Sequence, residues 1–104
     1  MSSFYHYSPF EKETLWVIPL FEMGVNGQLS IFLWESGMPY LSATIKIEGT
    51  LNSGEVAINN FEKGIGLLES MILAKIIEEP HRFVLEYGLE IPICKLLVEI
   101  PENS

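Results

Sequence analysis

The chain lacks aspartate altogether and has few of the side chains from which active sites are usually built. Its 104 residues include one cysteine and two histidines, and only six residues are lysine or arginine. All 14 acidic residues are therefore glutamates, and the formal net charge is −8. A chain this acidic repels phosphate backbones, so we expect no direct binding to nucleic acid.

Other absences bear on the compartment. Cys94 has no second cysteine with which to form an internal disulfide, which favours a reducing, cytoplasmic setting. The N-terminus carries neither the basic segment nor the apolar stretch of a signal peptide. Apolar runs such as 71–74 are far shorter than the about 20 residues that a membrane helix needs. We therefore expect a cytoplasmic protein that does not enter a membrane.

The composition that is present is typical of a folded domain. Hydrophobic residues make up 48% of the chain and aromatic residues 12%, whereas charged residues make up 19%. At this length we expect a loose N-terminal arm over residues 1–13 and a single domain over 14–104. Because a small domain has difficulty burying so much apolar surface, the composition also indicates a partner or a second copy.

Three antiparallel strands are predicted in the N-terminal half, over 14–23, 28–35 and 40–48. Asn26 and Gly27 form a hairpin signal between the first two, because both residue types tolerate positive φ. Residues 36–39 form a second turn, and the third strand alternates apolar and polar side chains. The sequence therefore predicts a three-stranded meander.

The C-terminal half predicts one main helix and further strands. The helix is expected at about 61–74, capped by Asn59 or Asn60, with Glu62 completing a capping pair. Its expected buried stripe is Phe61, Ile65, Leu68, Ile72 and Ile76. Strands are expected over 55–58, 82–87 and 89–100, and Pro92 indicates an edge strand or a bulge in the last. The fold class is α+β, with a mostly antiparallel sheet and one helix across a face.

The first two predicted strands are apolar on both faces, which is typical of strands buried on both sides. One helix covers only one face of a sheet, so the side that carries Trp16 and Trp34 needs another cover. The C-terminal segment, a curling of the sheet or another protein chain would each provide it.

Candidate chemical groups are few and poorly spaced. His6, His81 and Cys94 do not fall at the short spacings of metal ligands, and both histidines are expected to face solvent. Cys94 is expected to be a small core residue, because Lys95 beside it points to the opposite face of a strand. The sequence therefore predicts no catalytic residue, no cofactor and no metal.

Binding is the function class that the residues favour. Aromatic side chains anchor interfaces, and negative charge steers a protein towards basic partners. We expect a basic protein as the partner, with a homodimer as the alternative. The candidate protein-binding residues are Trp16, Phe32, Trp34, Tyr40, Glu78, Glu79, Glu86 and Glu90.

Four short segments carry a resemblance: 37–40 (GMPY), 54–58 (GEVAI), 66–69 (GLLE) and 91–96 (IPICKL). Over about residues 16–97 the chain resembles a family of small uncharacterised proteins of phages, plasmids and conjugative elements of gut bacteria. It departs from that family at 75–77 (KII), where the family has an ending rich in alanine and glycine. No functional residue carries over.

The resemblance implies an acidic accessory protein of a mobile element. Proteins of this type often inhibit host defence systems, including CRISPR nucleases, by occupying a basic surface. The predicted function is therefore a non-enzymatic, anti-CRISPR-like inhibitor that binds a protein. A small structural homodimer is the alternative, and an enzyme that uses Cys94 or His81 is the third possibility.

Overall fold

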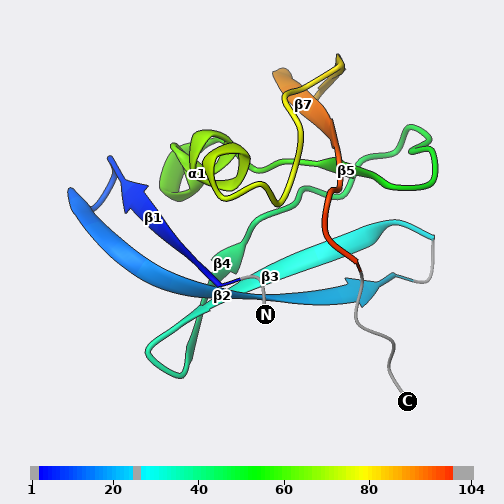
Figure 1. Cartoon of the computed structure of the whole chain (residues 1–104). Helices are drawn as coiled ribbons and strands as arrows, with labels where there is room; N and C mark the ends of the chain where they lie inside the picture. Colours follow the sequence, from blue (N-terminus) through cyan, green and yellow to red (C-terminus); the bar gives the residue numbers. More distant parts are fainter. Residues whose placement is uncertain (1–2, 25–26, 100–104) are drawn as a thin grey trace.

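The computed structural model describes residues 3–24 and 27–99 and confirms the α+β class. Two antiparallel sheets and one α-helix form the fold (Figure 1). The larger sheet has the strand order β1-β2-β3-β4, and the smaller has the order β5-β7-β6. The strands of the larger sheet are β1 (Phe4–Ser8), β2 (Glu13–Met23), β3 (Leu29–Glu35) and β4 (Met38–Ser42).

Strand β2 is long, and its two halves pair with different strands. Its first half pairs with β1, from Glu13 to Val17, and its second half pairs with β3, from Ile18 to Met23. The predicted hairpin between β2 and β3 is therefore present. Gly27 in its turn has φ +80°, whereas Asn26 lies outside the described residues.

The third predicted strand is shorter than expected. Strand β4 ends at Ser42, and Thr44 forms an isolated bridge with Ile58. The following residues leave the larger sheet and lead towards the smaller one, where the Ile45 amide donates to the Ala57 carbonyl at 2.9 Å. The alternating pattern of 40–48 therefore spans the transition between two sheets.

The prediction of a loose N-terminal arm is wrong for Phe4–Ser8, which forms β1. Phe4, His6 and Ser8 point inward and are buried, and Tyr5 and Tyr7 point outward. The inward positions carry a histidine and a serine, so the strand has no apolar stripe in the sequence. Residues 1–2 of the predicted arm lie outside the described part of the chain.

The smaller sheet consists of β5 (Glu55–Ala57), β6 (Arg82–Glu86) and β7 (Leu89–Lys95). The prediction that Pro92 marks an edge strand or a bulge is wrong, because β7 is the central strand and its register with β6 is continuous. The Pro92 carbonyl accepts a hydrogen bond from the Ile58 amide at 3.0 Å. The missing N–H of Pro92 faces the same side, where β5 has already ended at Ala57, so the pairing with β6 loses no donor.

The predicted helix is present but its α-helical part is shorter. A 3-10 turn, η1 (Glu62–Gly64), precedes α1 (Leu67–Leu73). Gly66 separates them with φ +93°, and a Cβ atom there would lie 2.9 Å from Pro9 Cδ. A glycine is required at this position both by its backbone angle and by its close approach to the end of β1.

The N-cap residue of α1 is Gly66 and not the predicted asparagine, but the Asn60 side chain still accepts from amides at the start of the helix. Asn60 Oδ1 accepts hydrogen bonds from the amides of Gly66 and Leu68, at 3.1 and 3.2 Å. The predicted capping pair is wrong, because Asn59 Oδ1 accepts from the Phe61 amide and Glu62 lies in the 3-10 turn. Because α1 begins only at Leu67, after Gly64 and Gly66, Asn59 and Glu62 do not lie at its N-terminus.

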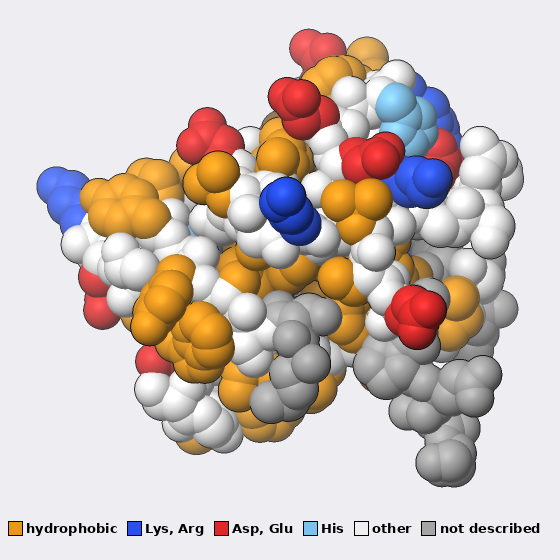
Figure 2. Space-filling view, in the orientation of Figure 1, with side chains coloured by type: hydrophobic (Ala, Val, Ile, Leu, Met, Phe, Trp, Pro, Cys, Tyr) orange, Lys and Arg blue, Asp and Glu red, His pale blue; other side chains and the backbone are white. Residues whose placement is uncertain are grey.

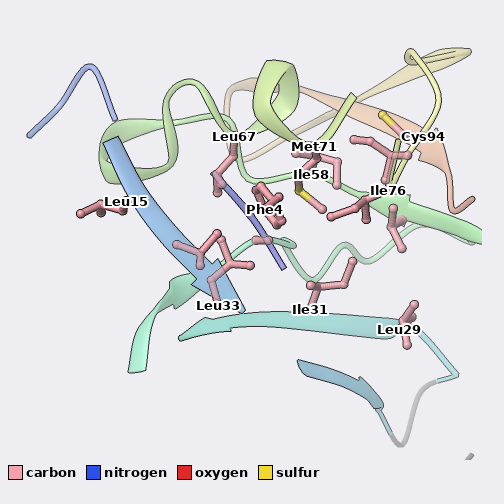
Figure 3. Packing of buried hydrophobic residues seen from close by; sticks show 14 residues of the cluster. Phe4, Leu15, Leu29, Ile31, Leu33, Ile58, Leu67, Met71, Ile76 and Cys94 are labelled. Atoms are coloured by element: carbon pink, nitrogen blue, oxygen red, sulfur yellow. The ribbon is translucent and has the colours of Figure 1, made fainter. Parts of the chain in front are cut away.

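One large core joins both sheets and the helix (Figure 3). Helix α1 contributes Leu67, Ser70 and Met71, whereas Leu68 and Ile72 of the predicted stripe are half-buried and Ile65 is exposed. A second cluster, on the other face of the smaller sheet, contains Ile47, Ala57, Ile91 and Ile93. Strands β5 and β7 of the smaller sheet are therefore packed on both faces, whereas Phe83 and Leu85 of β6 are exposed.

Candidate functional site

An exposed apolar face lies on the larger sheet, on the side turned away from α1, β5 and β7 (Figure 1). Residues that are directly paired across antiparallel strands share a face. Trp16 pairs with Tyr5, Leu20 with Phe32, and Ile18 with Trp34. We call this set the outer face, and it comprises Tyr5, Tyr7, Trp16, Ile18, Leu20, Phe32 and Trp34.

Most of the outer face is open to solvent. Tyr5 is 69% exposed, Trp16 49%, Leu20 47% and Phe32 39%. The rings of Tyr5 and Trp16 pack edge to face, with centroids 4.6 Å apart. Figure 2 shows hydrophobic side chains gathered below β2, on the side away from α1. Apolar side chains that are contiguous and exposed in this way mark interaction sites on small proteins.

A groove of about 870 Å³ runs across the larger sheet. Every residue that lines it belongs to β2, β3 or β4, and Leu20, Phe32 and Trp34 of the outer face are among them. Glu22 is its one charged lining residue, and no lysine or arginine lines it. The groove therefore combines aromatic and aliphatic walls with negative charge.

Three of the four predicted aromatic residues meet on the outer face: Trp16, Phe32 and Trp34. Tyr40 lines the groove together with Phe32 and Trp34, but its side chain also packs against the core, and its ring lies 6.5 Å from that of His6. Its hydroxyl donates a hydrogen bond to Glu11, and burial together with this contact raises the pKa of Tyr40 to about 12. Lys63 Nζ lies 4.5 Å from the Tyr40 ring centroid.

The predicted glutamates lie elsewhere. Glu86 belongs to β6 and Glu90 to β7, and Glu78 and Glu79 precede β6. The Glu86 carboxylate accepts hydrogen bonds from the amides of Glu48 and Gly49, at 2.8 and 3.0 Å. These glutamates border the smaller sheet, so the structure does not bring them together with the aromatic residues.

The acidic side chains do not form one patch on the face that Figure 2 shows. The red side chains are spaced apart, and several have a lysine, arginine or histidine near them (Figure 2). The segment that forms the larger sheet carries four glutamates (Glu11, Glu13, Glu22 and Glu35) and one cation, Lys12. The segment of the larger sheet is therefore acidic, but its glutamates are not concentrated on the outer face.

Sequence reasoning missed Tyr5, Tyr7 and Leu20. Tyr5 and Tyr7 lie in the predicted arm, and because the inward residues His6 and Ser8 are polar, the hydrophobic pattern of 4–8 does not reveal its alternation of buried and exposed side chains. Leu20 shares its face with Trp16, but nothing in the sequence shows that this face is left uncovered. The described C-terminal residues Leu96 and Val98 pack on the inner core and leave the outer face open.

Apart from the outer face, the structure has a cluster of polar side chains around Glu55, whose own side chain is 8% exposed. Arg82 Nη2 lies 2.8 Å from Glu55 Oε1, His81 Nε2 contacts Glu55 Oε2, and the Asn52 amide donates to Glu55 Oε1 at 2.8 Å. These contacts, with that of Arg82 the largest, lower the pKa of Glu55 to about 2. The cluster ties β5 to β6 across β7 and commits both oxygens of the carboxylate.

The histidines and the cysteine differ in their surroundings. His6 is buried, so the expectation of an exposed side chain is wrong for it, whereas the His81 side chain is 45% exposed. Cys94 is buried as predicted, and burial raises the pKa of its thiol to about 12, which disfavours the reactive thiolate. Over residues 3–24 and 27–99, no three histidine, cysteine or glutamate side chains form a group that could hold a metal ion.

No helix in the described part of the chain is long and apolar enough to cross a membrane. Comparison with protein-family models, curated proteins and solved structures found no match for this chain. The resemblance to proteins of mobile elements therefore stays a prediction.

Proposed function

We propose that this chain is a non-enzymatic protein-binding module that docks a partner protein on its outer face. The observation that carries the proposal is the groove over β2, β3 and β4, whose walls are aromatic and aliphatic and whose one charged lining residue is Glu22. Burying exposed rings such as Trp16 and Phe32 supplies affinity, because aromatic anchors dominate the energetics of interfaces.

The charge of the chain specifies the kind of partner. A docking segment with apolar side chains and a bordering lysine or arginine complements the groove, where Glu22 meets no cation among the lining residues. The net charge of −8 steers such a basic partner towards the chain and disfavours nucleic acid. The partner that we propose is therefore a basic protein, met in the cytoplasm.

The narrower form of this proposal is inhibition of a host defence nuclease, such as a CRISPR effector. It rests on the resemblance of four sequence segments and on the acidic charge, since nucleases present basic channels to their nucleic acid. The acidic side chains are spaced apart on the visible face, which favours docking through the outer face over imitation of a phosphate backbone (Figure 2).

The test compares two surface variants, one on each sheet, that each replace an exposed apolar side chain by serine. The variant Phe32→Ser truncates the outer face, and Leu85→Ser truncates an exposed side chain of β6 on the smaller sheet. Purified basic effectors, including a CRISPR nuclease loaded with its guide, are titrated with each protein at low and at moderate salt. We expect Phe32→Ser to weaken binding at least tenfold and Leu85→Ser to leave it unchanged. Equal binding by both variants would place the interface elsewhere.

A homodimer is the second candidate, because the same outer face is apolar enough to pair with a copy of itself. Light scattering over a range of concentrations separates the two. A dimer that Phe32→Ser dissociates and Leu85→Ser retains would favour self-association. A wild-type chain that stays monomeric at high concentration would remove this candidate.

A further inference from the structure

Strand β1 joins the outer face to a buried histidine. Tyr5 and Tyr7 point outward from it, and His6, between them, is 0% exposed. The inner side of β1 lies against α1, where His6 Nδ1 is 2.7 Å from Ser70 Oγ. A change at His6 therefore acts on the strand that positions part of the outer face.

The hydrogen bonds of Ser70 determine which nitrogen of His6 carries the proton. Ser70 Oγ lies 3.0 Å from the Gly66 carbonyl oxygen, which can only accept. The single hydroxyl proton of Ser70 is used there, so Ser70 Oγ accepts from Nδ1–H of His6. Nε2 is then the unprotonated nitrogen of a neutral ring, and it has no hydrogen-bond partner among the described residues.

Protonation of His6 would place a new N–H at Nε2 with no described acceptor. It would also place a positive charge in the core, which is costly without a partner. Burial lowers the pKa of His6, and this effect outweighs the charge of Glu11, which favours the imidazolium. The other titratable groups on the elements around His6 are the tyrosines Tyr5 and Tyr7 of β1 and Tyr40 of β4, the glutamates Glu13 and Glu22 of β2, Glu62 of η1 and Glu69 of α1, and Lys63 of η1.

We propose that His6 is a proton-sensitive latch that holds β1 against α1, and that acid releases β1 and dismantles the part of the outer face formed by Tyr5, Tyr7 and Trp16. A group with a lowered folded pKa stabilises the fold above its unfolded pKa, here 6.5, and this stabilisation is lost as the pH falls. The consequence for binding rests on the proposed function, whereas the latch itself is a property of the free chain.

The test therefore uses the free chain. In a Trp34→Phe background Trp16 is the only tryptophan, and its emission reports its packing against Tyr5. Between pH 8 and pH 4 we expect a step in emission with its midpoint below 6.5, along which the population of the released state rises by up to about tenfold per pH unit. His6→Asn keeps an amide donor towards Ser70 and does not titrate, so the step should disappear. His81→Asn should retain it.

Imidazole nitrogen spectra of the wild-type chain decide the question if His6→Asn does not fold. The chain has only two histidines, and the His81→Asn spectrum assigns them. We expect His6 to carry its proton on Nδ1 and to stay neutral until the Trp16 signal changes. A proton on Nε2, or protonation of His6 at pH 6.5 with an unchanged Trp16 signal, would overturn the latch. Neither outcome depends on whether a partner docks.

Discussion

Strands β3 and β7 are both apolar on their two faces, but only β7 is buried on both of them. In β7 the consecutive residues Ile91, Pro92, Ile93 and Cys94 are all buried, because the strand lies between two hydrophobic clusters. In β3, Ile31 and Leu33 are buried, whereas Phe32 between them is 39% exposed. The two sequences have the same kind of pattern, so the pattern alone does not separate a core strand from one that presents a docking surface.

The largest effect is expected from truncation at the strand that is packed on both faces. Ile93 is fully buried in the cluster that also contains Ile47 and Ile91. We expect Ile93→Ala to lower the free energy of unfolding by about 2–5 kcal/mol, through lost burial and the cavity that remains. Leu85→Ala on β6, at a side chain that is 74% exposed, should change it by about 0.5 kcal/mol or less. Urea unfolding measures both, and equal losses would show that the smaller sheet is not packed as described.

The Glu55 cluster sharpens the comparison, because its ion pair joins β5 to β6 across β7, the strand that is packed on both faces. Glu55→Gln should lower the free energy of unfolding at pH 7 by about 1–3 kcal/mol, since Arg82 and His81 lose a charged acceptor. The folded pKa of Glu55 lies near 2, below its ordinary 4.5, so its contribution is present above pH 4.5 and is lost as the pH falls towards 2.

Urea unfolding between pH 7 and pH 3 measures this difference. The wild-type chain should lose stability more steeply below pH 4.5 than Glu55→Gln does. Glu79→Gln, at an exposed glutamate that precedes β6, serves as the control and should follow the wild type. If the two variants have the same pH dependence, the contacts of Glu55 do not stabilise the folded state.

Periodicity and turn chemistry predicted much of the fold. The turn glycines Gly27 and Gly37 fall where hairpins occur, and Asn60 accepts from amides at the start of the helix although Gly66 is its N-cap residue. The sequence failed where tertiary contacts override local pattern. His6 takes an inward position of β1 because it bonds to Ser70, 64 residues away, and Pro92 occupies a central strand because its missing N–H faces away from β6.

The candidate site was predicted in part for the same reason. Trp16, Phe32 and Trp34 share a face because alternation along a strand is local, so the sequence was enough to group them. Tyr40 lines the groove with Phe32 and Trp34, but it also packs against the core, beside a register shift between Leu33 and Trp34 that no local pattern indicates. The glutamates were grouped with the aromatic residues on charge alone, and the assignment of residues to two sheets is not encoded in any short segment.

A smaller effect separates the two faces of β3 itself. Phe32→Ala removes a side chain that contacts its cross-strand neighbours on the outer face, so we expect a loss of about 0.2–1 kcal/mol in the free energy of unfolding. Ile31→Val, at the adjacent fully buried position, removes only one methylene group yet should cost about 0.5–1.5 kcal/mol. Thermal and urea unfolding of the two variants provide the measurement. A larger loss for Phe32→Ala would mean that the outer face is covered in the free chain and is not available for docking.

The smallest effect is expected at the one charged residue of the groove. Glu22 is exposed, so Glu22→Gln should leave the free energy of unfolding within about 0.5 kcal/mol of the wild type. If a cation of the partner meets Glu22 at the border of the apolar contact, the variant should weaken association on the order of two- to fivefold at low salt. This difference should shrink as salt is added, because exposed charges are screened over about 10 Å at 0.1 M. Glu69→Gln, an exposed glutamate on α1 and on the other side of the larger sheet, controls for net charge and should have no such effect. Equal, salt-dependent weakening by both variants would show that the net charge of the chain, and not the position of Glu22, selects the partner.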